Sequence, residues 1–160
     1  MNKLFTSVAI AASLCAAIIS VDQAEAKKVT ATVNMKSFRG PPAYVALYLT
    51  KPDGQFHSTV AVRGGKQKYR RHLRGWFRGV SKSGRPVDGV SGASVGSGRS
   101  FEVQADIADA LLNAGYKLHV DTAVEDVADY RGEATLELNP DKSQASARGK
   151  GFVKSVTISH

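Results

Sequence analysis

The chain has 160 residues, a length that suits one domain with a buried core. Its formal net charge is +8 at pH 7. Its single cysteine, Cys15, excludes an intramolecular disulfide and a thiolate metal site. The positive charge predicts an anionic partner, such as a phosphate-bearing cofactor, an anionic lipid surface or an acidic protein.

The N-terminus has the pattern of a cleaved secretory signal peptide over residues 1–26. A short positive region containing Lys3 precedes a mostly apolar run at 4–19, and an A-x-A site ends at Ala26. We therefore expect export to the periplasm and one mature domain over residues 27–160. Loss of one lysine, one aspartate and one glutamate with this leader raises the net charge from +8 to +9.

Three strands are expected at the start of the mature domain. Residues 29–38 alternate between apolar and polar side chains, which is typical of a half-buried strand. Residues 43–50 are apolar on both sides, as in a buried strand. Residues 56–63 form the third strand, and the Lys-Pro-Asp-Gly turn at 51–54 predicts a hairpin, because Pro fixes φ and Gly tolerates positive φ.

Residues 66–80 predict an amphipathic helix. Apolar and aromatic side chains recur there at three- and four-residue spacing, namely Tyr69, Leu73, Trp76, Phe77 and Val80. The stretch from Arg63 to Arg85 contains nine Lys or Arg residues and no acidic residue, whereas ten acidic residues lie between Glu102 and Asp141. The domain therefore has a strong charge asymmetry.

A loop at 81–98 follows the helix, and strand patterns return after it. Apolar alternation is visible at four further segments, 99–105, 115–124, 131–138 and 151–159. Residues 106–114 fit either a helical turn or a long loop. About seven strands with one inserted helix predict a mainly β fold, an immunoglobulin-like β-sandwich.

The loop contains the sequence DGVSGAS at residues 88–94. It resembles the acceptor motif D-x-x-[ST]-G-A-[ST] that periplasmic FAD:protein FMN transferases recognise, with hydroxyl residues at Ser91 and Ser94. The resemblance implies that Ser94 receives FMN through a phosphoester bond. A serine hydroxyl is a poor nucleophile by itself, so the transferase is expected to activate it.

The composition of the motif agrees with this role. Gly92 and Ala93 are small, so the backbone can enter the active site of a modifying enzyme. Asp88 is expected to hydrogen-bond backbone amides and shape the turn. The alternative is that the Gly/Ser-rich segment is a flexible linker.

A wider resemblance covers roughly residues 28–139. The segment from Tyr44 to Tyr48, then Lys68-Tyr69 with Leu73 and Trp76, then the 88–94 motif occur in the order found in domain-of-unknown-function family 2271 (DUF2271). The family consists of small periplasmic proteins. Their association with flavin transferases and PepSY-type membrane proteins implies FMN carriage and electron transfer. This chain departs from many relatives in its turn at 51–54 and in having Ser rather than Thr at position 94.

Side chains of the predicted helix are candidates for holding the flavin. The aromatic rings of Tyr69, Trp76 and Phe77 either stack on the isoalloxazine ring or form the core-facing stripe of the helix. Four arginines either pair with the FMN phosphate or form a solvated basic face that docks on an acidic partner, and these are Arg70, Arg71, Arg74 and Arg78.

Other classes of function have less support in the sequence. Export argues against nucleic-acid binding, whereas a basic amphipathic helix is compatible with an anionic membrane surface. The four histidines show no metal spacing, and no G-x-S-x-G, H-E-x-x-H or C-x-x-C-H motif occurs. We therefore expect a redox carrier rather than a free-standing enzyme.

Two functions stay open at this point. The first is a periplasmic electron carrier with FMN on Ser94, which serves a PepSY-type membrane reductase or an iron-reduction system. The second is a cofactor-free, immunoglobulin-like binding module whose basic helix holds an anionic partner or membrane surface.

Overall fold

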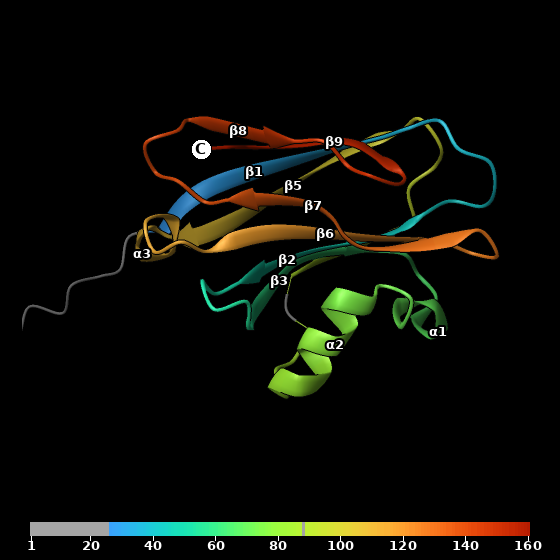
Figure 1. The fold of residues 1–160 in the computed structure, drawn as a ribbon, viewed down its shortest axis with the longest axis horizontal. Coiled ribbons are helices and arrows are strands. Elements are labelled where there is room, and N and C mark those ends of the chain that lie inside the picture. Colours follow the sequence, from blue (N-terminus) through green and yellow to red (C-terminus); the bar gives the residue numbers. More distant parts are fainter. Residues whose placement is uncertain (1–25, 88) are drawn as a thin grey trace, which may run out of the picture.

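The protein is a sandwich of two β-sheets (Figure 1), seen in a computed structural model that describes residues 26–87 and 89–160. The four-stranded sheet contains, in spatial order, β5 (Ser100–Ala108), β1 (Ala26–Met35), β9 (Val153–Ser159) and β8 (Gln144–Ala147). The five-stranded sheet contains β4 (Val90–Gly92), β3 (Phe56–Arg63), β2 (Tyr44–Thr50), β6 (Lys117–Val124) and β7 (Ala128–Glu137). The described helices are α1 (Gln67–Arg70), α2 (Arg74–Ser83) and α3 (Asp109–Leu112). The expected all-β sandwich is confirmed.

The pattern of apolar residues sets the position of the core. Along β1, alternate side chains from Val29 to Met35 are buried and those between them are partly exposed, so one face of the strand meets the core. All seven residues of β2 are buried. Val45 and Leu47 point into the sandwich, and Tyr48 lies under the helices on the opposite face of the sheet. This double covering explains why β2 shows no alternation in the sequence.

Helix α2 lies on the outer face of the five-stranded sheet (Figure 1). It covers a second apolar cluster made of Tyr44, Ala46, Tyr48, Val62, Leu73, Trp76 and Ala123. The Trp76 side chain is 2% exposed, and its indole Nε1 donates a hydrogen bond of 3.0 Å to Thr59 Oγ1. The apolar stripe of the helix therefore packs against the sheet.

A buried carboxylate joins this helix to the sheet. Asp121 Oδ2 accepts hydrogen bonds from the amides of Gly75 (2.6 Å) and Trp76 (2.9 Å). Asp121 Oδ1 accepts from the Tyr48 hydroxyl (3.2 Å) and the Gly132 amide (2.7 Å). The first amides of a helix have no intrahelical acceptor and carry partial positive charge, so a carboxylate stabilises them. Burial and the Asp121 carboxylate also raise the pKa of Tyr48, so its hydroxyl stays a donor.

A second buried carboxylate, Glu133 on β7, connects the two sheets. It accepts hydrogen bonds from the Thr122 hydroxyl and from the amides of Gly151 and Val153. Gly151 lies just before β9 of the four-stranded sheet, so this contact links β6 and β7 to the opposite layer.

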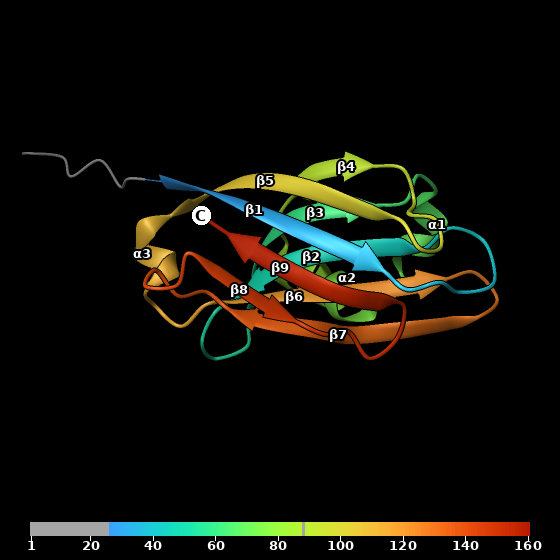
Figure 2. The ribbon, with the colours of Figure 1, turned by 90° about the horizontal axis from the view of Figure 1, so that it is seen from above.

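The structure differs from the sequence-based expectation at three segments. The helix expected over 66–80 is interrupted after Arg70, and α2 begins at Arg74 because Asp121 binds amides of the new first turn. Strand β4 lies inside the segment expected to be a loop, at the edge of the sheet beside β3 (Figure 2). Strand β8 has four residues, too few to give an alternating pattern.

We expect Asp121→Ala to lower the free energy of unfolding by about 3 kcal/mol, because several buried donors lose their acceptor. Loosening of α2 should also shift the emission of Trp76, the only tryptophan in the chain, to longer wavelength. Urea unfolding followed by this emission measures both effects. Asp141→Ala, at an exposed position, is the control and should stay within about 0.5 kcal/mol. Equal losses in the two variants would contradict this assignment.

Candidate functional site

The acceptor-like motif crosses the end of β3. Gly92, the last residue of β4, pairs with Arg63 in a parallel ladder, and the Gly64 amide donates to the Gly92 carbonyl at 2.8 Å. Val95 then pairs with Ala43, directly before β2, through two backbone hydrogen bonds of 2.8 Å each. The two residues between these anchors therefore pass from the edge strand to β2, at the point where β3 has ended.

The pairing of Ala43 with Val95 indicates which side of the sheet Ser94 faces. Ala43 and Val95 both belong to the sandwich core. Side chains of successive residues in an extended chain point to opposite faces. Counted back from Val95, this rule predicts that Ser94 faces the outer side, as Tyr44 does; residues 93 and 94 themselves belong to no strand. Ser94 is partly exposed and Ala93 is exposed, so this part of the motif is accessible to an enzyme.

Gly64 makes this crossing possible. Gly64 has a φ of +127°, and a Cβ there would lie 1.9 Å from Cδ1 of Tyr44. Only glycine therefore lets the Tyr44 ring lie over the end of β3. Gly65, the next residue, borders open space. Strand β3 ends at Arg63, directly before this pair.

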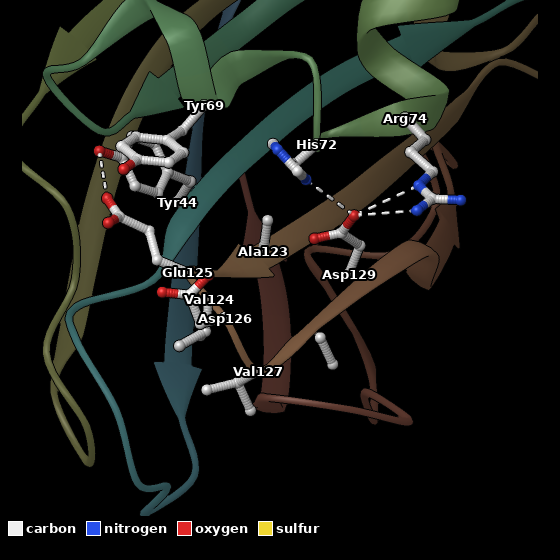
Figure 3. Close-up of a pocket in the computed structure, with 11 residues that line it drawn as sticks. Tyr44, Tyr69, His72, Arg74, Ala123, Val124, Glu125, Asp126, Val127 and Asp129 are labelled. Carbon is white, nitrogen blue, oxygen red and sulfur yellow. Dashed lines mark hydrogen bonds and ion pairs between the residues drawn. The ribbon is translucent and has the colours of Figure 1, made fainter.

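Beside Tyr44, the outer face contains a groove of about 350 Å³, which we call the outer groove (Figure 3). One end is formed by the rings of Tyr44 and Tyr69, whose centroids lie 5.5 Å apart. The buried Ala123 and Val124 of β6 contribute apolar surface. The turn at 125–127 between β6 and β7 forms one rim. The groove is therefore aromatic and aliphatic inside and polar at its edges.

Charged side chains lie at both ends of the outer groove (Figure 3). At one end, Asp129 Oδ2 is 3.1 Å from His72 Nδ1 and 3.2 Å from Arg74 Nη2. At the other end, the Tyr44 hydroxyl donates to Glu125 Oε1 at 3.3 Å. Burial and the Glu125 carboxylate raise the pKa of Tyr44, so its hydroxyl remains protonated at neutral pH.

Two lysines add positive charge near the aromatic end. The ammonium groups of Lys66 and Lys68 lie 5.6 and 4.7 Å from the centroid of the Tyr69 ring, within cation–π range. Both lysines are exposed. They therefore place positive charge over the Tyr69 ring, outside the residues that line the groove.

Two of the residues predicted from the sequence to hold a flavin lie in one groove, and the others do not. Tyr69 and Arg74 line the outer groove. Trp76 lies beneath α2 and is covered by the protein, so its ring offers no face for stacking in this conformation. Arg70 is half-buried and Arg71 is exposed, and neither lines the groove. Asp88 lies outside the described residues.

Sequence reasoning missed Tyr44, His72, Glu125 and Asp129 as members of this site. Tyr44 belongs to a strand that is apolar on both sides, and Glu125 lies in a turn, where a solvated side chain is expected. His72 and Asp129 are 57 positions apart. Only the pairing of β2 with β6 and of β6 with β7 brings these residues to one surface.

A larger groove of about 850 Å³ lies beside α2, next to β6 and β7, and His119 is one of the polar residues that line it. The ring nitrogens of His119 lie 2.9 Å from Thr50 Oγ1 and 3.1 Å from Thr135 Oγ1. The ring also stacks on Tyr48 at 5.3 Å. Burial lowers the pKa of His119, which favours the neutral ring. In the described residues, no cluster of three or more His, Cys, Asp or Glu could hold a metal ion.

The comparison with known protein families agrees with the family resemblance found in the sequence. The model of the family described as "Predicted periplasmic protein (DUF2271)" matches residues 26–155. The chain belongs to DUF2271. The match includes the five-stranded sheet, the outer groove, the motif segment and the four-stranded sheet up to the start of β9. No curated protein and no solved structure matches the chain. None of the helices in the described part of this DUF2271 protein is long and apolar enough to cross a membrane.

We expect Gly64→Ala to lower the free energy of unfolding by about 2–4 kcal/mol, because it combines positive φ with a clash against the Tyr44 ring. Gly65→Ala is the matched control, since a Cβ there meets open space, and it should change stability by less than about 0.5 kcal/mol. Urea unfolding of the two variants tests the assignment, which fails if they are equally stable.

Acid should destabilise the fold through His119. Its folded-state pKa is lowered, so the unfolded chain binds this proton more readily, and stability falls as pH drops below the ordinary histidine value of about 6.5. We expect the loss of unfolding free energy between about pH 7.5 and 5.5 to be smaller in His119→Gln. Parallel stability curves for the two proteins would refute this role.

Proposed function

We propose that this protein carries FMN covalently on Ser94 and acts as a periplasmic electron carrier. The observation that carries the proposal is the path of the motif over the end of β3. It leaves a partly exposed serine between two backbone anchors and next to small residues. An acceptor for a macromolecular enzyme needs this combination of access and small side chains.

The modification is a phosphoryl-group transfer from FAD. Ser94 Oγ attacks the phosphorus of the FMN half of FAD, and the bond from that phosphorus to the bridging oxygen breaks. AMP leaves with the bridging oxygen, and the hydroxyl proton passes to a base of the FAD:protein FMN transferase or to solvent. The carrier supplies the hydroxyl, and the transferase supplies the activation.

The redox chemistry then belongs to the flavin, and the protein positions it. The proposed electron donor is a PepSY-type membrane reductase, and ferric iron is a proposed acceptor. The basic face of α1 and α2 is suited to docking on an acidic partner or an anionic membrane surface, because its cations are exposed. The exposed cations of this basic face include Lys68, Arg71, Arg74, Arg78 and Lys82.

The same basic face favours the second candidate, a cofactor-free binding module. In that case the sandwich would hold an anionic partner through α1 and α2, and the motif would be a loop without modification. The two functions differ in whether the exported protein gains mass and colour, so one purification distinguishes them.

Co-production with an active FAD:protein FMN transferase should give a yellow protein whose intact mass exceeds the processed chain by FMN minus water. Ser94→Ala should remove both the colour and the added mass while the fold remains. Ser100→Ala, an exposed serine outside the motif, should retain them. A colourless wild-type protein, produced beside a transferase that modifies another acceptor, would overturn the proposal.

A further inference from the structure

We propose that the outer groove binds the isoalloxazine ring of the flavin. The attachment of this ring to Ser94 rests on the proposed function, whereas the ring site is a property of the groove itself.

The inner side of the motif is already filled. A Cβ on Gly92 would lie 1.9 Å from Nη1 of Arg63, so the guanidinium occupies that space. Arg63 also lies over the Phe101 ring at 4.9 Å and donates to the Glu102 carbonyl at 3.3 Å. The space between Gly92 and the four-stranded sheet is therefore occupied by the Arg63 side chain. The proposed flavin on Ser94 turns the other way, towards the outer face.

The inside of the outer groove suits a planar, partly apolar ring. Tyr44 is buried and Tyr69 is partly buried, and both rings line the groove. Val127 is 54% exposed on the rim and extends the apolar surface. Aromatic rings stack favourably on flat π-systems, and aliphatic groups complement the dimethylbenzene end.

The polar end of the groove suits the pyrimidine end of the ring. Asp129, 15% exposed, pairs with His72 and Arg74, whose side chains are 40% and 69% exposed. The guanidinium has five N–H donors, so it can reach the flavin carbonyl oxygens while its pairing with Asp129 is kept.

Because the flavin would be attached to the protein, an open groove is sufficient to hold its ring. A flavin held on a short flexible arm has an effective concentration on the order of mM, so the groove needs only weak intrinsic affinity. An open groove also leaves part of the ring exposed for electron exchange with a partner.

The test uses the Ser94→Ala protein, which the transferase cannot modify at this position, titrated with free FMN in phosphate buffer. Inorganic phosphate competes for the basic side chains, so binding that remains reports the ring. We expect saturable quenching of FMN fluorescence, weakened roughly two- to tenfold by Tyr69→Leu. Phe77→Leu removes an aromatic ring that is 44% exposed on α2 and does not line the groove, so it should have no effect.

Val127→Asp is a second variant, because it changes only an exposed side chain on the rim and should also weaken binding. Trp76 emission checks that each variant is folded. Absence of saturable binding, or equal effects of the Tyr69 and Phe77 variants, would overturn the ring site.

The modified protein gives the second measurement. At equal FMN occupancy by intact mass, Tyr69→Leu should raise the flavin emission of the attached cofactor, and Phe77→Leu should not. If FMN never attaches, the proposed function fails and the titration still decides the ring site. If FMN attaches but neither measurement responds to Tyr69→Leu, the ring site fails and the carrier function stands.

Discussion

The Asp121 carboxylate is the interaction on which the outer face depends. It lies inside the five-stranded sheet, yet two of its acceptor bonds go to the first amides of α2 and one goes to the Tyr48 hydroxyl beneath that helix. A buried charge is costly unless its hydrogen bonds are complete, and here helix, strand and the amide of Gly132 complete them together. The helix is thereby fixed over β2, and with it the residues that precede it.

The position of the outer groove follows from that arrangement. Because α2 must begin at Arg74, the chain from Gly64 to Leu73 has to cover the distance from the end of β3, and it does so through the short helix α1. This path places Tyr69 against Tyr44 and His72 near Asp129. One buried acid therefore helps to position the Tyr44 and Tyr69 rings and the His72 side chain, although these residues lie far from it in the sequence.

The pattern of apolar residues was sufficient to predict most of the strands of the fold. The seven strands expected from alternation or apolar runs occur, because each buries one or both faces in the sandwich. Strands β4 and β8 could not be predicted, since three or four residues held at an edge show no period. The break between α1 and α2 was also hidden, because it depends on Asp121, a residue 46 positions after Gly75.

The candidate site was less accessible to sequence reasoning than the fold. The motif draws attention to Ser94, and the helix pattern identified Tyr69 and Arg74. Trp76 and Tyr69 belong to the same periodic pattern of apolar residues. The pattern cannot tell a ring buried under the helix from a ring at the edge of the groove. Glu125 and Asp129 come from a turn and an adjoining strand whose partners are set by the register of β6 with β2 and β7.

The backbone hydrogen bonds on both sides of Ser94 have a consequence for any cofactor carried there. Gly92 is tied to Gly64, and Val95 is tied to Ala43, so the point of attachment cannot swing between partners as a long flexible linker would. Electron donor and acceptor would have to approach the same edge of the sandwich in turn, or face each other across it. The whole protein, rather than the attached cofactor alone, would then have to move between donor and acceptor.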